Sequence, residues 1–391
     1  MRFVLANRHL NAAGGTEVHL VTIGEELQRL GHEVVIYSPE VGSFGEHMRG
    51  RGLDVRDSLS ELPETCDVAL SQDARVAYEL GERYPDALSV FRVCGYEFDF
   101  QLPPRLHHVV DLVLVMSDRY QRVAEAMAVP VPVLRLTIPI DIDRLVPLGP
   151  IRERPERAVV LGNYGEREEM VREVWGRAGI DVRRVGGDTP DVQSYEVAEA
   201  LADADIVVAK NRAAVDAMAC GRAVYVFDIL GGDGWVTPET YAAMEADLFW
   251  GQATDRVIDS ATLLSDLDGY RREMGVVNRD LVLQHHRGRD HVIALVAALG
   301  EHRPGERDPK APLRELARLT ATAWSWEEEA RRFRSNYWPL RTNADLTEQA
   351  LAETLEAADE LHAQIAAMRS TRAWRLATAW WRLKARLARR S

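Results

Sequence analysis

Short apolar runs alternate with amphipathic segments along residues 1–300. The runs are rich in valine, isoleucine and leucine, which predicts buried strands. They fall at residues 2–7, 33–37, 67–71, 89–93, 112–115, 133–138, 158–161, 181–185, 206–208 and 223–227. Between the first two runs, Leu20, Ile23, Leu27 and Leu30 keep the spacing of one helix face. Strands that alternate with helices predict an α/β fold with parallel sheets.

This pattern of strands and helices occurs twice. Residues 148–155 are rich in proline and charge and make the best linker candidate. We therefore expect one domain at residues 1–148 and a second at 149–300, closed by a long helix at about 278–299. Residues 301–391 are expected to form a helical extension, with a polar tether at 301–310 and helices at 313–334 and 346–390.

A cationic corner lies in the second domain. The predicted strand at 206–208 leads into Lys210, Asn211 and Arg212, and a helix at 213–220 follows. The strand at 223–227 then leads into a glycine loop at 231–234. Parallel α/β sheets bind ligands at the carboxyl ends of their strands, where such corners lie. The same pattern fits an ordinary strand–helix–strand unit with solvated charges.

A glycine turn lies in the first domain. Gly14 and Gly15 precede Thr16, which is expected to cap a helix that ends near Leu30. The turn lacks the G-x-G-x-x-G spacing of a dinucleotide site. It does let the backbone approach a ligand, and the helix N-terminus offers unpaired N–H groups to an anion.

The charge and the cysteine content of the chain argue against some classes of protein. The chain has 48 Lys and Arg against 61 Asp and Glu, and the net charge of −13 argues against a general nucleic-acid binder. Cys66, Cys94 and Cys220 show no metal or redox spacing. No apolar stretch reaches the ~18 residues of a membrane span. We expect a cytoplasmic protein.

The end of the chain has the opposite charge. Residues 369–391 carry eight Lys or Arg, no Asp or Glu, and the tryptophans Trp374, Trp380 and Trp381. A basic helix with tryptophans suits an anionic membrane surface. A coiled-coil partner helix, or packing on the acidic remainder of the chain, would produce the same pattern.

Four stretches carry a resemblance to GT-B glycosyltransferases of the retaining family four. They are the glycine turn with the following helix and strand entry at 11–17 and 30–34, VVDLVLVMS at 109–117, IPIDID at 138–143 and VDAMACGRAV at 215–224. In the third stretch, Asp143 matches the family's aspartate. The resemblance implies two Rossmann-like domains that face a cleft, the first for the acceptor and the second for the nucleotide-sugar donor.

The resemblance also implies roles for individual residues. Lys210 and Arg212 would stabilise the charge of the departing diphosphate. The ribose hydroxyls would bind Asp216, and the diphosphate or the acceptor would lie against Gly14 and Gly15. Backbone N–H groups around Gly232 would contact the donor. The general base would be Glu97 or Asp99. Such enzymes need neither a metal ion nor a bound cofactor.

The expected function is transfer of a sugar from a nucleotide-sugar to an acceptor hydroxyl, in glycan or surface polysaccharide synthesis. The acceptor would be a glycan, a lipid-linked molecule or a small molecule. The sequence departs from the family where Val208 replaces the first glutamate of its Glu-x7-Glu motif and Cys94 stands near its usual histidine. Two alternatives therefore remain: a non-catalytic glycan-binding or scaffold protein, and a sugar-nucleotide epimerase of the same fold.

Overall fold

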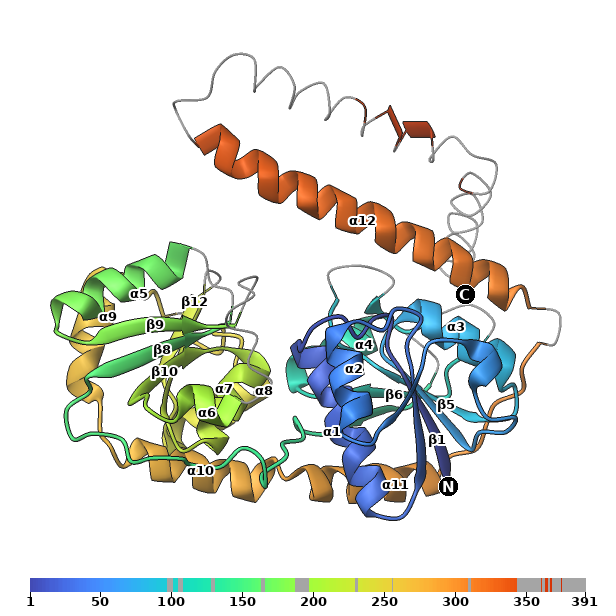
Figure 1. The fold of residues 1–391 in the computed structure, drawn as a ribbon, viewed down its shortest axis with the longest axis horizontal. Helices are drawn as coiled ribbons and strands as arrows, with labels where there is room; N and C mark the ends of the chain where they lie inside the picture. Colours follow the sequence, from blue (N-terminus) through green and yellow to red (C-terminus); the bar gives the residue numbers. More distant parts are fainter. Residues whose placement is uncertain are drawn as a thin grey trace. The chain divides into compact units, whose positions relative to one another are not determined.

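The computed structural model describes most of the chain. The described residues are 1–96, 101–104, 108–127, 131–162, 166–186, 197–228, 231–254, 256–308, 311–342, 360, 363, 364, 366, 367 and 374. The chain divides into two compact units, Met1–Ala321 and Thr322–Ser391. The first unit contains both sheets (Figure 1).

Among the described residues, the N-terminal sheet has seven parallel strands. In spatial order they are β3 (Asp54–Arg56), β2 (Glu33–Tyr37), β1 (Arg2–Ala6), β4 (Val68–Ser71), β5 (Leu88–Arg92), β6 (Leu112–Val115) and β7 (Val133–Arg135). The helices of this half are α1 (Gly15–Arg29), α2 (Ser43–Gly50), η1 (Leu59–Glu61), α3 (Ala74–Arg83) and α4 (Asp118–Ala126).

The C-terminal sheet has five strands, of which one edge strand is antiparallel. In spatial order they are β12 (Gly231–Trp235), β11 (Ala223–Asp228), β10 (Ile206–Ala209), β8 (Arg157–Leu161) and β9 (Asp181–Val185). The helices of this half are α5 (Glu166–Arg177), α6 (Val197–Leu201), α7 (Asn211–Ala219), α8 (Pro238–Ala246), α9 (Ser260–Ser265), η4 (Asp266–Gly269) and α10 (Met274–His285).

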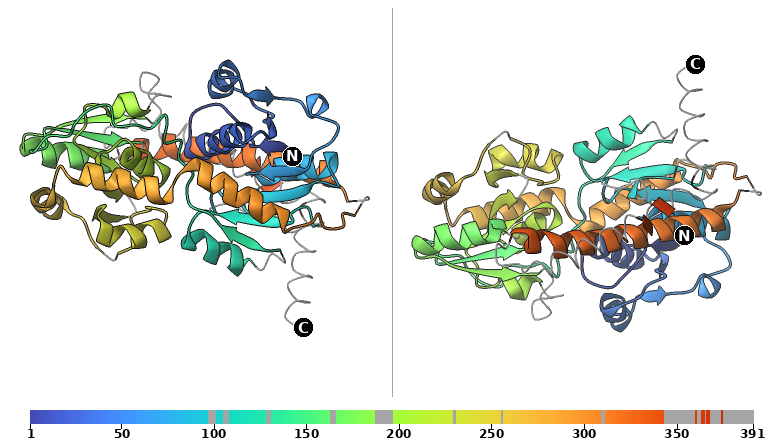
Figure 2. Two further views of the ribbon diagram at one scale, coloured as in Figure 1. Left: turned by 90° about the horizontal axis from the view of Figure 1, so that it is seen from below. Right: turned by 90° about the horizontal axis from the view of Figure 1, so that it is seen from above.

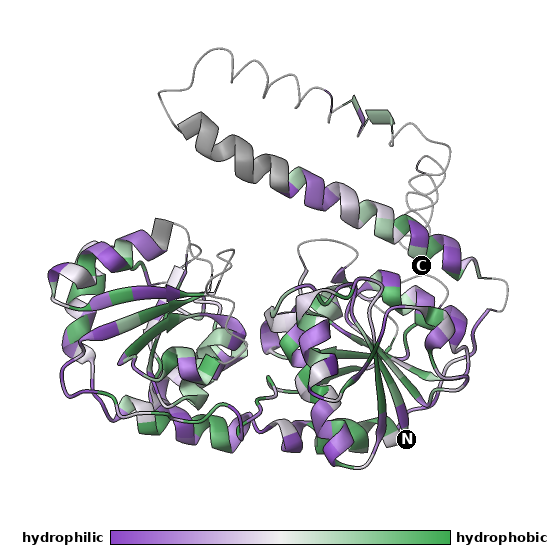
Figure 3. Cartoon of the chain, viewed as in Figure 1, coloured by the Kyte–Doolittle hydropathy of each residue, from purple (hydrophilic) through white to green (hydrophobic). Residues whose placement is uncertain are grey.

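Buried apolar strands explain why these segments form two sheets. All residues of β4, β6, β10 and β11 are buried, and Figure 3 shows inner strands of both sheets in the green of hydrophobic residues. A strand covered on both faces needs apolar side chains on both, which is the pattern of a parallel sheet between helix layers. The α/β architecture expected from the sequence is confirmed.

The chain crosses between the two sheets twice. The first crossing follows β7, and the second lies between α10 and α11 (Gly288–Gly300). The two segments form a bridge at Ile140 and Arg287, where the N–H of Ile140 donates to His286 O and the N–H of Gly288 donates to Ile140 O, each over 2.8 Å. α10 packs on α7, whereas α11 packs on α1 (Figures 1 and 2). The prediction of one helix at about 278–299 is therefore wrong.

The break between α10 and α11 lies where the two connecting segments pack closely. A Cβ atom added to Gly288 would lie 3.0 Å from Ile140 O, so the bridge leaves little room for a side chain. Val292, Leu295 and Leu299 on α11 belong to the same apolar core as Leu20 and Ile23 on α1. The residues from Gly288 onward thus complete the N-terminal half, although they lie within the range 149–300 expected for the second domain.

Two smaller predictions are corrected. The glycine segment 231–234, expected as a loop, lies in β12, which pairs with β11. α1 begins at Gly15 with Gly14 in the N-cap position, so Thr16 does not cap it. The helix predicted at 313–334 is α12 (Leu313–Thr342), which continues further than expected.

Some predictions lie outside the described residues. They are the general base candidates Glu97 and Asp99 and, apart from six single residues in the range 360–374, the helix at 346–390 and the basic tail at 369–391. Within the described part of the chain, no helix is long and apolar enough to cross a membrane. The described part also has no group of three or more histidine, cysteine or acidic side chains that could hold a metal ion.

Candidate functional site

A cleft of about 440 Å³ lies between the two sheets. Its N-terminal wall consists of the glycine turn, one face of α1, α2 and the turn at 141–145. The other wall consists of α7 and the residues at the carboxyl ends of β8 and β9, namely Leu161, Gly162, Val185 and Gly186. The carboxyl ends of parallel strands are the usual ligand site of such sheets.

The glycine turn packs closely at this cleft. Gly14 is the N-cap of α1, and a Cβ atom there would lie 2.4 Å from Oε2 of Glu17. A Cβ atom on Gly15 would lie 3.8 Å from Cβ of Arg212, across the cleft. The N-terminal end of α1 and that of α7 therefore meet at one end of the cleft.

Glu17 supports this turn from within the fold. Its Oε1 accepts a hydrogen bond from Asn7 Nδ2 over 3.0 Å and lies 3.4 Å from His9 Nδ1. The side chain is buried, and burial raises the pKa of its carboxyl group against the opposing effect of His9. The sequence showed Glu17 at the start of a helix but gave no sign of this buried network.

Arg212 lines the cleft and joins its two walls. Its Nη1 donates to Pro139 O over 3.1 Å, and its Nη2 donates to Thr22 Oγ1 over 3.2 Å. Arg212 is only 8% exposed, and burial lowers the pKa of its guanidinium. The predicted phosphate cation is therefore already bonded to the N-terminal half of the protein.

Asp216 lies one turn further along α7 in the same wall. Its Oδ1 is 3.5 Å from Nε of Arg212, and both atoms are buried without a hydrogen-bond partner in the described residues. Burial raises the pKa of the Asp216 carboxyl group, while Arg212 and Arg144 oppose that rise. A buried acceptor without a donor costs free energy, and a ligand hydroxyl would remove that cost.

Lys210 does not line this cleft. Its Nζ forms an ion pair with Oδ2 of Asp228 and lies 5.2 Å from the ring centre of Trp250. Asp228 is 1% exposed and ends β11, so the carboxylate neutralises Lys210 inside the C-terminal half. The structure separates the two cations that the sequence placed at one corner.

Gly232 also lies away from the cleft. A Cβ atom there would be 2.5 Å from Ile258 Cδ1 and 2.8 Å from Phe227 Cδ2. Close packing in the C-terminal core thus accounts for a glycine at this position. Of the predicted site residues that the structure describes, Gly14, Gly15, Arg212 and Asp216 lie together around the cleft, whereas Lys210 and Gly232 do not.

Sequence reasoning missed two arginine contacts. Arg144 lines the cleft from the turn at 141–145, and its only sequence signal was the adjacent segment that resembles the family's crossing. Arg119 on α4 binds the other half of the protein, donating to Asp247 Oδ1 over 2.7 Å and to Gln252 Oε1 over 2.8 Å. Nothing in the sequence pairs Arg119 with partners more than a hundred residues away.

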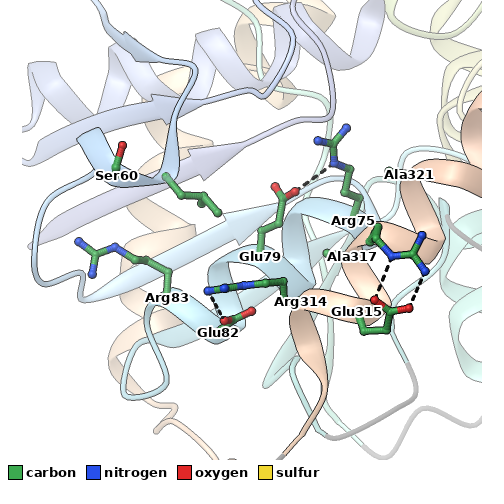
Figure 4. A pocket seen from close by; sticks show the side chains of 11 residues that line it. Ser60, Arg75, Glu79, Glu82, Arg83, Arg314, Glu315, Ala317 and Ala321 are labelled. Carbon is green, nitrogen blue, oxygen red and sulfur yellow. Dashed lines mark hydrogen bonds and ion pairs between the residues drawn. The ribbon is translucent and has the colours of Figure 1, made fainter.

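A second hollow, of about 780 Å³, lies between α3, η1 and the first turns of α12 (Figure 4). Arg75 binds Glu79 over 3.0 Å, Arg314 binds Glu82 over 2.8 Å, and Arg318 binds Glu315 over 2.5 Å. The guanidinium groups drawn there are thus bound to carboxylates of the same walls or, for Arg83, to the carbonyls of Leu62 and Pro63. None of the predicted site residues that the structure describes lines this hollow.

Comparison with known proteins places the fold. No family model and no curated protein matches the chain. Among solved structures, Anabaena HepE in complex with UDP and glucose matches at 10% identity with a TM-score of 0.52, over 77% of this chain and 100% of that one. An α-glucosyltransferase in complex with UDP and a DNA containing an HMU base matches at 13% identity with a TM-score of 0.51, over 77% and 99%. The chain has the GT-B fold, as its motifs predicted.

Proposed function

We propose that this protein transfers a sugar from a nucleotide-sugar donor to an acceptor hydroxyl. The observation that carries the proposal is the cleft between the two sheets, in which Arg212, the N-terminal end of α1 and a carboxylate oxygen of Asp216 meet. That oxygen is paired in charge with Arg212 but accepts no hydrogen bond from the described residues. A nucleoside diphosphate has matching groups, since its ribose hydroxyls are donors and its phosphates are anions.

The similar structures support the same chemistry. HepE was solved with UDP and glucose, and the α-glucosyltransferase was solved with UDP and modified DNA. Both share this fold with the present chain over most of their length. A cleft at the carboxyl ends of β8 and β9 is where such a fold would hold the nucleotide.

The residues of the cleft would act in three ways. Asp216 accepts hydrogen bonds from the ribose. Cations beside the cleft stabilise the negative charge that develops on the departing diphosphate. The N-terminal end of α1, opened by Gly14 and Gly15, offers backbone N–H groups to an anion. The general base remains a prediction on Glu97 or Asp99, outside the described residues.

The finer features of the reaction are part of the proposal. Retention at the sugar carbon, action without a metal ion and a role in glycan or surface polysaccharide synthesis rest on the resemblance of the four sequence stretches. A cytoplasmic location, with the basic tail 369–391 on an anionic membrane surface, rests on the composition of the chain.

A non-catalytic glycan-binding or scaffold protein is the second candidate. Val208, which replaces the family's first glutamate, is 1% exposed inside β10, and Lys210 is neutralised by Asp228. Both observations remove groups that a transferase of this fold would use. Such a protein would still bind a nucleotide in the cleft.

Release of the nucleoside diphosphate separates the candidates. The full chain is incubated with UDP-, ADP- and GDP-sugars, with and without glycan and lipid-linked acceptors, and free nucleoside diphosphate is measured. Acceptor-dependent release supports transfer. Tight nucleotide binding without release under any acceptor supports the scaffold, and conversion of one nucleotide-sugar into another supports an epimerase. Asp216→Asn is the matched variant and should weaken nucleotide binding, since it keeps the shape of the side chain and removes its charge.

A further inference from the structure

The turn at 141–145 holds Arg144 at the cleft. It belongs to the first crossing between the two sheets, and Asp141, Arg144 and Leu145 all line the cleft. Asp141 is 6% exposed, and its Oδ1 accepts the backbone N–H of Asp143 over 3.1 Å and that of Arg144 over 3.2 Å. Its Oδ2 accepts from Arg29 Nη2 over 3.1 Å. The backbone from which Arg144 projects is thus fixed by one buried carboxylate.

A second side chain fixes the same turn from the other half of the protein. Arg279 on α10 donates from Nη2 to Ile142 O over 3.0 Å and from Nη1 to Leu145 O. The same Nη1 donates to Ala219 O, the last residue of α7, over 2.6 Å. The turn is therefore attached to the helix that carries Arg212 and Asp216. Such support holds a binding residue in place before a ligand arrives.

The charges around Asp216 complete the arrangement. Two guanidinium groups, those of Arg212 and Arg144, are the nearby cations that act on its buried carboxyl group. Arg212 donates hydrogen bonds from two of its nitrogen atoms to Pro139 O and Thr22 Oγ1. Lys210 pairs with Asp228 and lies outside the cleft. Two cations that the sequence favoured for phosphate binding are thus engaged within the protein.

We propose that Arg144 binds the diphosphate of the nucleoside diphosphate donor, in the role expected for Lys210. A guanidinium offers two parallel N–H groups to phosphate oxygens, which suits a cation that must hold and stabilise an anion. The ribose lies against Asp216, and the phosphates extend toward Arg144. This inference rests on the proposed function of the cleft.

A comparison of nucleotides with their nucleosides tests this role. Binding of UDP, ADP and GDP, and of uridine, adenosine and guanosine, is measured by calorimetry with the full chain and with Arg144→Gln. For the preferred base we expect the Kd of the diphosphate to rise about 10- to 100-fold, as for loss of a hydrogen bond to a charged group. The Kd of the nucleoside should change less than about twofold, because a nucleoside has no phosphate.

Two further variants test whether the change in affinity is specific to Arg144. Arg144→Lys keeps the charge and should recover part of the diphosphate affinity. Arg177→Gln removes an arginine of α5 that is 75% exposed and paired with Glu173, and it should leave both affinities unchanged. Equal weakening of diphosphate and nucleoside, or no weakening of either, overturns the role of Arg144 and leaves the proposed function in place. Absence of any nucleotide binding by the unaltered chain overturns the proposed function as well.

Discussion

Arg212 on α7 donates a hydrogen bond to Oγ1 of Thr22 on α1, over 3.2 Å. The bond joins side chains that are 190 residues apart in the chain. The two helices that carry them belong to different halves of the protein. Thr22 in turn donates to Val18 O over 2.7 Å, so its hydroxyl both donates and accepts a hydrogen bond. This hydroxyl therefore connects α1 in the N-terminal half to α7, the helix that begins at the proposed donor site.

Removing this hydroxyl should destabilise the protein. Thr22→Val keeps the shape of the side chain and leaves Nη2 of the buried Arg212 without its acceptor. We expect a loss of about 1–3 kcal/mol in the free energy of unfolding, measured by denaturant titration. Thr320→Val is the control, because Thr320 makes the same bond to the carbonyl four residues earlier in α12. Equal losses for the two variants would show that the contact with Arg212 contributes nothing.

The pair formed by Lys210 and Asp228 should be structural. Lys210→Met leaves the buried carboxylate of Asp228 without its ammonium partner and should cost about 2–3 kcal/mol of unfolding free energy, a value reduced because solvent reaches part of Lys210. Lys210→Met combined with Asp228→Asn should recover most of that loss. The affinity for UDP in the double variant should stay within about threefold of the unaltered protein, which is less than the change we expect for Arg144→Gln. A larger fall would return Lys210 to the donor site.

Arg119 and Asp247 should couple the two halves. Their side chains are 21% and 9% exposed, so solvent screening weakens the pair, and we expect a coupling energy of about 1 kcal/mol. A double-mutant cycle with Arg119→Gln and Asp247→Asn measures it through the unfolding free energy. The cycle for Arg177 and Glu173, which are 75% and 59% exposed, should give nearly zero. The coupling of the first pair should fall as salt is added, since screening by ions acts on charges that solvent reaches.

Buried histidines at the second crossing should make the protein sensitive to acid. His286 donates from Nδ1 to Ile138 O over 2.9 Å, and its Nε2 lies 2.9 Å from the hydroxyl of Tyr241, from which the neutral ring accepts. Burial lowers the pKa of His286 to about 4 and that of His291 to about 3. Because these values lie below the ordinary value near 6.5, the stability is present above pH ~6.5 and is lost as the pH falls toward 4.

The loss should reach about 1.4 kcal/mol per pH unit for each such histidine. Denaturant titrations between pH 7.5 and 4.5 measure this slope. His291→Gln should make the slope shallower, since one proton fewer is taken up on unfolding, whereas replacement of the exposed His285 by Gln should change it little. An unchanged slope for His291→Gln would contradict this account.

The basic tail can be tested separately. Deletion of residues 369–391 removes eight Lys or Arg and three tryptophans, and it should abolish sedimentation with vesicles that contain phosphatidylserine. Neutral vesicles are the control and should bind neither form. If the deleted chain still sediments with these vesicles, residues 369–391 are not the membrane-binding segment.

The strands were the most predictable part of the fold. The runs at 33–37, 112–115 and 181–185 match the observed strands to the residue. For 33–37 the reason is local, because the polar residues His32 and Ser38 bound the buried apolar run. The glycine segment 231–234 was expected as a loop. It is an edge strand instead, since the hydrogen bonds to β11 outweigh the local preference of glycine, and such pairing leaves no periodic signal in the segment.

The sequence predicted only those parts of the site whose residues lie close together in the chain. The glycine turn and the helix with Arg212 and Asp216 could be found, since parallel strands bring their carboxyl ends to one edge. Two other features could not be predicted from the sequence, because each depends on how separate elements pack. They are the pairing of Lys210 with Asp228 and the support of the Arg144 turn by Arg279. The break between α10 and α11 has the same origin, since α11 leaves the second sheet to pack on α1.

The bridge between Ile140 and Arg287 restricts how the cleft can open. A single connecting segment would leave the halves free to swivel about its length. Two adjacent segments joined by backbone hydrogen bonds resist torsion more than one segment does. Opening the cleft between Gly15 and Arg212 would also break the hydrogen bond from Arg212 to Thr22, so the bridge and this bond together hold the two walls of the cleft.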